Sequence, residues 1–139
     1  MTNLHILLVD DHEVVRRGLR ALLMSHAGWE VVGEATNGQD AVEMARQLKP
    51  DVIVMDISMP KMNGLEATRC ILETAPQTAV LIFTMHQSVQ ILREMAKAGA
   101  RGYVLKSHAS QDLIAAVEAL SRNETFFKSG LEDPLSRAA

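Results

Sequence analysis

Hydrophobic positions along the chain follow two alternating rhythms. Short, nearly continuous apolar runs are typical of strands buried on both faces of a sheet. Between them, apolar residues recur every three or four positions, as on one face of a helix. The runs expected as strands are Ile6–Val9, Val31–Val32, Val52–Met55, Val80–Phe83 and Tyr103–Leu105. Helical spacing follows each run, at positions 15–23, 41–48, 65–72, 89–96 and 113–120.

Turn and capping residues agree with this division. Asn37-Gly38 and Asn63-Gly64 precede two of the expected helices. Ser110 is expected to cap the last helix, because its hydroxyl can accept from backbone N–H groups that have no partner within the helix. Five strand–helix units of this kind predict an α/β fold: a doubly wound, five-stranded parallel sheet with helices on both faces.

Polar residues at the strand ends bear on the order of the strands, which periodicity alone does not fix. One common doubly wound order is 2-1-3-4-5, with its functional crevice at the carboxyl ends of the first and third strands. Polar side chains stand at this edge of the sheet, at the ends of four strands: Asp10 and Asp11, Asp56, Thr84 and Lys106. An acid at one strand end is usually a cap or a solvated residue, but the combination favours a site.

The three aspartates suggest the chemistry of this site. Neighbouring carboxylates repel one another, and a bound Mg²⁺, which prefers oxygen ligands, would neutralise them. An aspartate can also act as a nucleophile toward a phosphoryl group. Asp56 stands alone on the central strand and is the best candidate acceptor, whereas the paired Asp10 and Asp11 suit the metal. Lys106 can pair with Asp56 or with a phosphate oxygen, to which the Thr84 hydroxyl can donate.

Composition and charge exclude several other classes of protein. The 139 residues suit one domain, and a net charge of −3 without a long basic run argues against a dominant nucleic-acid surface. A single cysteine excludes an internal disulfide. Without a signal-like start or an apolar run of about 18 residues, we expect a cytoplasmic protein that does not cross a membrane. Residues 122–139 lack periodicity and are interpreted as a tail or linker after a domain at 1–121.

Three stretches together resemble the receiver domain of two-component response regulators, which has a flavodoxin-like fold. They are the acidic turn Leu7–Asp11, the segment Asp56–Gly64 and the approach to the lysine, Ala98–Lys106. The resemblance runs from about residue 6 to residue 120. Two further stretches, Asp11–Leu19 and Gly33–Gly38, look like the NarL/FixJ (LuxR-type) branch, whose members usually carry a C-terminal helix-turn-helix DNA-binding domain.

The resemblance implies roles for the metal-binding and acceptor residues. Asp56 would receive a phosphoryl group from a partner histidine kinase. Asp11 and Asp56 would bind Mg²⁺ directly, with Asp10 nearby through water. The backbone carbonyl of Ser58 would complete the protein ligands.

The resemblance also implies a switch. Thr84 and Lys106 would sense the phosphoryl group, and Tyr103 would change rotamer when Thr84 moves. Many receivers have proline after the lysine, and this chain has Ser107. Ser58 and His86, two residues beyond Asp56 and Thr84, are positions that can tune the lifetime of the phosphoryl group.

The expected function is therefore a signalling switch and not an enzyme beyond its own phosphorylation and dephosphorylation. It would change partner binding or dimerisation and regulate transcription through an effector domain absent from this chain, which should not itself bind DNA. The alternatives are a stand-alone receiver and a binding module independent of phosphorylation. A phosphatase of the haloacid-dehalogenase type is disfavoured because Asp10 lacks a partner acid two residues on, where His12 stands. We expect His12 to open the first helix without direct chemistry.

Overall fold

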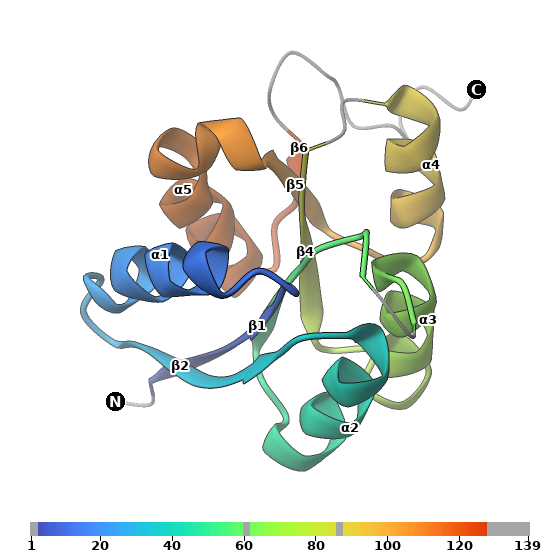
Figure 1. The fold of residues 1–139 in the computed structure, drawn as a ribbon, viewed down its shortest axis with the longest axis horizontal. Coiled ribbons are helices and arrows are strands. Elements are labelled where there is room, and N and C mark those ends of the chain that lie inside the picture. Colours follow the sequence, from blue (N-terminus) through green and yellow to red (C-terminus); the bar gives the residue numbers. More distant parts are fainter. Residues whose placement is uncertain (1–2, 60–61, 86–87, 128–139) are drawn as a thin grey trace.

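The computed structural model describes residues 3–59, 62–85 and 88–127. Within these residues one parallel sheet lies between two layers of helices (Figure 1). The strands are β1 (Leu4–Val9), β2 (Trp29–Ala35), β3 (Val52–Met55), β4 (Ala79–Thr84), β5 (Gly102–Leu105) and β6 (Phe126–Phe127). The helices are α1 (Glu13–Met24), α2 (Gly38–Leu48), α3 (Gly64–Thr74), α4 (Val89–Lys97) and α5 (Ala109–Ser121), with a 3₁₀ turn η1 at Lys106–His108.

The strand order is β2-β1-β3-β4-β5-β6. The predicted doubly wound fold and its order 2-1-3-4-5 are confirmed, but the expectation of only five strands is wrong. Phe126 and Phe127 pair in parallel with β5, and the Phe126 N–H donates to the Arg101 carbonyl over 2.9 Å. A two-residue strand is too short to show periodicity, so the interpretation of 122–139 as tail or linker overlooked it. Residues 128–139 lie outside the described residues, and the domain boundary after 121 stays a prediction.

Alternate side chains of the central strands point into two separate cores. In β1, Ile6 and Leu8 pack on the side covered by α1 and α5, whereas Leu7 and Val9 pack on the side covered by α2, α3 and α4 (Figure 1). All four are essentially inaccessible to solvent. Strands buried on both faces must be apolar throughout. This requirement explains why the sequence shows continuous apolar runs here, and why the polar residues of the central strands lie near the strand ends.

The helix starts are as predicted at two positions and differ at a third. The Asn37 side chain accepts from the Asp40 N–H at 2.8 Å, and Asn63 caps α3 in the same way. Ser110 is not the cap of α5, because the turn η1 runs directly into the helix, which begins at Ala109. The hydroxyl of Ser110 therefore lies inside the first turn. None of the helices in these residue ranges is long and apolar enough to cross a membrane.

Candidate functional site

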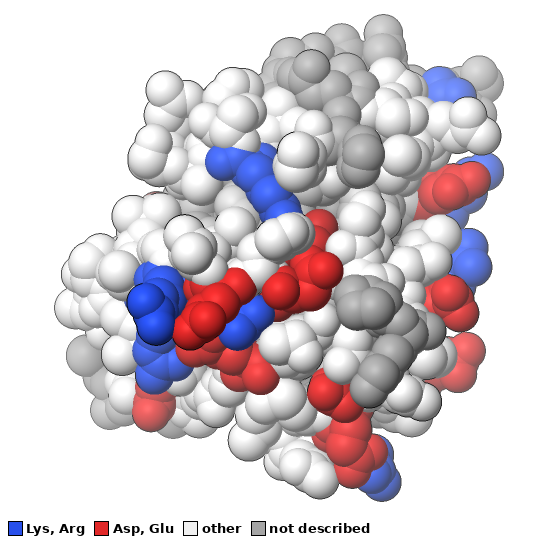
Figure 2. Space-filling view, in the orientation of Figure 1, with Lys and Arg blue, Asp and Glu red and all other residues white. Residues whose placement is uncertain are grey.

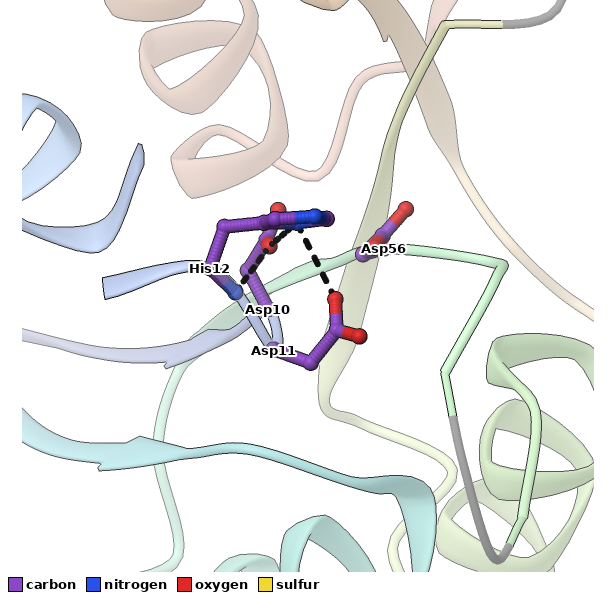
Figure 3. A group of neighbouring side chains, drawn as sticks. All are labelled: Asp10, Asp11, His12 and Asp56. Carbon is purple, nitrogen blue, oxygen red and sulfur yellow. Dashed lines mark hydrogen bonds and ion pairs between the residues drawn. The ribbon is translucent and has the colours of Figure 1, made fainter. Parts of the chain in front are cut away.

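The carboxyl ends of β1 and β3 bring the three predicted aspartates together. The two strands pair with Val9 beside Met55, so the residues that follow them, Asp10 and Asp56, emerge side by side. The Asp56 N–H donates to the Val9 carbonyl at 2.9 Å, which extends the ladder by one bond. Asp11 completes the group shown in Figure 3. Acidic side chains gather in the middle of this face of the molecule, with basic ones beside them (Figure 2).

These carboxylates differ sharply in burial. Asp10 and Asp56 are 1% and 4% exposed, whereas Asp11 is exposed to solvent. One ligand atom each from Asp10, Asp11, His12 and Asp56 can be chosen so that all lie within 4.8 Å of one another. A cation offsets the cost of burying carboxylates, and a mainly oxygen-donor group that includes the exposed Asp11 fits a hard divalent ion that keeps part of its water shell. The aspartates thus form a group that can hold a metal.

Lys106 supplies a positive charge from the end of β5. Its Nζ lies 2.8 Å from Asp10 Oδ2 and 3.5 Å from Asp56 Oδ2. The closer partner is thus Asp10, although the sequence had suggested Asp56. Asp10 Oδ2 is fully buried, and the ammonium contacts it as an ion pair outside hydrogen-bonding geometry. All described peptide bonds are trans, and Ser107 lies in the 3₁₀ turn that follows the lysine.

One lysine does not fully compensate two buried carboxylates. Burial, with a further contribution from the negative charge of Asp10, raises the pKa of Asp56 above its ordinary value. The Lys106 ammonium and the backbone N–H groups of Ser58 and Ile57 act against this rise. Because the net effect is a raised pKa, the site without a metal disfavours the charged form of Asp56, and an added cation would stabilise that charged form.

Two residues that sequence reasoning had not placed in the site support the β1–α1 turn. His12 opens α1 as expected, but its Nδ1 lies 3.0 Å from Asp10 Oδ1 and 3.1 Å from Asp11 Oδ1 (Figure 3). Arg16 donates from Nη1 to the Asp10 carbonyl at 2.7 Å and from Nε to Glu34 at 2.9 Å. Arg16 could have been found from the sequence by its position one helical turn after His12, which places it on the side of α1 that faces the end of β1.

The β3–α3 loop is held by close approaches of backbone to backbone. Gly64 donates its N–H to the Ile57 carbonyl at 2.9 Å, and a Cβ on it would lie 2.2 Å from the Asp56 carbonyl oxygen. Gly38, at the start of α2, donates to the Met62 carbonyl at 2.9 Å, and a Cβ there would lie 2.1 Å from that oxygen. Only glycine fits at both positions, so two helix N-termini hold residues 57 and 62 of the loop that begins with the candidate acceptor.

The remaining predicted residues lie at the same edge or beside it. Ser58 is exposed in the β3–α3 loop, while Thr84, the last residue of β4, is 1% exposed. Tyr103 is 2% exposed and lies in a small apolar cluster with Leu92, to which Phe127 of β6 adds. Burial raises the pKa of the Tyr103 hydroxyl.

Register relates the two predicted switch residues. Thr84 pairs with Leu105 and Tyr103 with Ile82, so Thr84 and Tyr103 project to the same side of the sheet, two positions apart on adjacent strands. Residues 60, 61, 86 and 87, which include Pro60 of the resemblance and the predicted tuning residue His86, lie outside the described residues.

Comparison with known proteins decides the family. The profile of the response regulator receiver domain matches residues 6–118. The chain belongs to the response regulator receiver domain family. The solved structure of a LuxR-family two-component response regulator from Aurantimonas sp. SI85-9A1 superimposes with a TM-score of 0.90 at 36% identity, covering 99% of this chain and 100% of that one. The predicted resemblance to receivers of the NarL/FixJ branch is confirmed.

Relatives of this receiver domain are longer proteins. The response regulator UvrY of Escherichia coli K12 is 37% identical over 133 residues, which are 96% of this chain and 61% of UvrY. The response regulator GacA of Pseudomonas aeruginosa is 34% identical over 131 residues, 94% of this chain and 61% of GacA. The chain thus spans about three fifths of the length of these two relatives.

Proposed function

We propose that this receiver domain accepts a phosphoryl group on Asp56 from the phosphohistidine of a sensor kinase. The observation that carries the proposal is the convergence of three aspartates and Lys106 at one sheet edge in a chain of the receiver family. An Asp56 carboxylate oxygen would form the new P–O bond as the P–N bond of the donor breaks. The donor imidazole, protonated on its other ring nitrogen, would keep the electron pair of that bond and leave as neutral imidazole. The product is an aspartyl phosphate.

The metal in this proposal is Mg²⁺, held by Asp11 and Asp56, with Asp10 nearby through water and the Ser58 carbonyl as a further ligand. When bound, it would neutralise charge on the carboxylates and on the phosphoryl oxygens. Lys106, which contacts both Asp10 and Asp56 in this structure, would bind a phosphoryl oxygen once Asp56 carries the group. Intact-mass analysis after incubation with Mg²⁺ and a small acyl phosphate tests the proposal. We expect one added phosphoryl group that removal of Mg²⁺ prevents; no adduct under rapid quench would favour a phosphorylation-independent binding module.

Thr84 and Tyr103 form the proposed output of the switch. The Thr84 hydroxyl would move to a phosphoryl oxygen, and the Tyr103 ring, on the same side of the sheet, would follow into the space that Thr84 leaves. The result would be altered partner binding or dimerisation at the surface of α4, β5 and α5. Thr84→Ala should still accept the phosphoryl group but lose the change at Tyr103 seen by NMR. An unaltered Tyr103 response would rule out this coupling.

A groove of about 400 Å³ between α1 and α5 adjoins the site, and we propose that the kinase docks in it. It is lined by apolar residues that include Val14 and Leu22 of α1 and reaches Lys106, and Val14 is 81% exposed. A helix of the donor lying here would approach Lys106, whose Nζ is 3.5 Å from Asp56 Oδ2, and could present its phosphohistidine to the acceptor. Val14→Glu should slow transfer from a phosphohistidine protein tenfold or more without affecting transfer from a small acyl phosphate. Equal effects on both donors would contradict this placement.

The wider role follows from the relatives and is also a proposal. We infer that this receiver belongs to a signalling switch and not to an enzyme acting on other substrates. A DNA-binding domain outside this chain would regulate transcription in response to the state of Asp56. The alternative is a stand-alone receiver.

A further inference from the structure

The His12 imidazole is the one nitrogen donor in the metal-binding group of the described residues. Its Nδ1 lies between two carboxylates from the same turn, 3.0 Å from Asp10 Oδ1 and 3.1 Å from Asp11 Oδ1 (Figure 3). A carboxylate oxygen only accepts hydrogen bonds, so the Nδ1 proton is donated to Asp10 Oδ1, with Asp11 Oδ1 close by at ion-pair distance. A metal ion that displaced this proton would find a nitrogen and two oxygens already gathered.

The spacing of these three atoms fits coordination as well as hydrogen bonding. Neighbouring ligand atoms of an octahedral ion with bonds of about 2.1 Å lie roughly 3.0 Å apart. The two distances from Nδ1 match this edge length. The Lys106 ammonium contacts Oδ2 of Asp10, whereas His12 contacts Oδ1. An ion on the Oδ1 side would therefore leave the lysine contact in place. Asp10 Oδ1 would also keep the hydrogen bond that it accepts from the backbone N–H of His12 at 2.9 Å.

The His12 side chain is free to take a metal because the fold does not need it elsewhere. It is 63% exposed, whereas Asp10 is 1% exposed, so the ring covers the open side of the site without forming part of the core. The residue occupies the N-cap position of α1 but makes no side-chain capping bond. Among the residues that the structure describes, rotation of the ring toward an ion would break polar contacts with the two aspartates alone.

Ligand chemistry decides which ions would engage the ring. Mg²⁺ prefers oxygen and dehydrates reluctantly, whereas imidazole suits divalent ions of the later first-row transition metals. We propose that His12 is a selective metal ligand, which binds Co²⁺, Ni²⁺ or Zn²⁺ at the acidic site through Nδ1 and makes no bond to Mg²⁺. The proposal deepens the proposed function because it concerns the same site. It implies that traces of such ions compete with Mg²⁺ on the receiver.

Metal titration of the full chain by calorimetry tests this role. Co²⁺ and Mg²⁺ alone are the probes, on the parent, on His12→Gln, and on His5→Gln as a control that removes a half-buried histidine on β1 that is absent from the metal-binding group. We expect His12→Gln to weaken Co²⁺ at least tenfold and to alter Mg²⁺ less than twofold, and His5→Gln to change neither. Equal loss of both ions in His12→Gln, or loss of neither, would overturn the proposal.

A second measurement needs no variant. Long-range ¹H–¹⁵N spectra of the parent chain with Zn²⁺ should shift the Nδ1 resonance of His12 as its proton is replaced, whereas Mg²⁺ should leave that nitrogen protonated. A shift of Nε2 alone, or none, would contradict ligation through Nδ1. Both readouts are independent of phosphorylation. If Asp56 failed to accept a phosphoryl group, the proposed metal preference of His12 would be unaffected. If His12 showed no metal preference, the proposal that Asp56 is the phosphoryl acceptor would be unaffected.

Discussion

Two connections deliver carboxylates to the same site, and they are held in different ways. The β1–α1 turn, which carries Asp10 and Asp11, is supported by side chains, because Arg16 and His12 contact its carbonyl and carboxylate groups. The β3–α3 loop, which begins with Asp56, is held by backbone against backbone at Gly38 and Gly64. The first connection should therefore be sensitive to changes of charge, and the second to any added side-chain volume.

The largest expected effect is that of Gly64→Ala. The new Cβ would lie 2.2 Å from the Asp56 carbonyl oxygen and 2.9 Å from the Ile57 Cα, neither of which belongs to a side chain that could move aside. We expect the free energy of unfolding to fall by about 3 kcal/mol and phosphorylation to slow at least tenfold, measured by chemical denaturation and rapid-quench mass analysis.

Gly18→Ala is the matched control for this change. Apart from its own stretch of helix, no atom of the described residues lies within 4 Å of the position its Cβ would take, and the glycine is inside α1. Alanine should therefore raise stability by up to about 1 kcal/mol through its higher helix propensity. If the two alanine variants had similar stability, backbone contact would not be what fixes the β3–α3 loop.

Removal of a side-chain support should cost less. Arg16→Met would break the bond to the Asp10 carbonyl and one contact with Glu34, and we expect a loss of about 1–2 kcal/mol. Arg17→Met removes an exposed pair with Glu13 on the same helix and should change stability by less than about 0.5 kcal/mol. Thermal denaturation of both variants tests the difference; equal losses would show that the β1–α1 turn does not depend on Arg16.

Apart from the control variants, the smallest expected effect is a gain in stability. Because burial and Asp10 raise the pKa of Asp56 in the folded state, its charged form reduces stability at neutral pH. Asp56→Asn should therefore raise the free energy of unfolding at pH 7 by up to about 1 kcal/mol. As the pH falls through the raised pKa, the folded parent takes up the proton and the difference between the two chains shrinks.

Chemical denaturation of both chains in the presence of a chelator, from pH 7 down through the raised pKa of Asp56, measures this gain in stability. Added Mg²⁺ should stabilise the parent more than Asp56→Asn, since the anion is then compensated. A variant less stable than the parent at pH 7 would mean that the Lys106 pair outweighs the burial of Asp56.

The position of the candidate acceptor and its neighbours could be predicted because it depends on topology. In a parallel sheet, the residues that follow adjacent strands must meet at one edge, so the order 2-1-3-4-5 was enough to bring Asp10, Asp56 and Lys106 together. Strands buried on both faces leave an equally clear apolar pattern. The strands follow from the chain's periodicity and the meeting of their ends follows from the strand order, and neither requires the rotamer of any side chain.

What could not be predicted depends on particular contacts between distant residues. The rotamer of His12 decides whether it meets two carboxylates or water, and no pattern in the sequence encodes it. The pairing of Phe126 with β5 depends on an available sheet edge, which only the assembled fold supplies. The contact of Gly38 with the Met62 carbonyl joins two helix starts, each of which looks like an ordinary Asn-Gly cap in the sequence.

Chemical mapping of the phosphorylated residue tests the central claim most directly. After incubation with Mg²⁺ and a small acyl phosphate, borohydride reduces an aspartyl phosphate to homoserine, whose position tandem mass spectrometry reads within a peptide. We expect homoserine in place of Asp56 and nowhere else, and none when Asp56→Asn is treated in the same way. Homoserine in place of Asp10 or Asp11 in the parent chain would show that the acceptor has been assigned to the wrong strand.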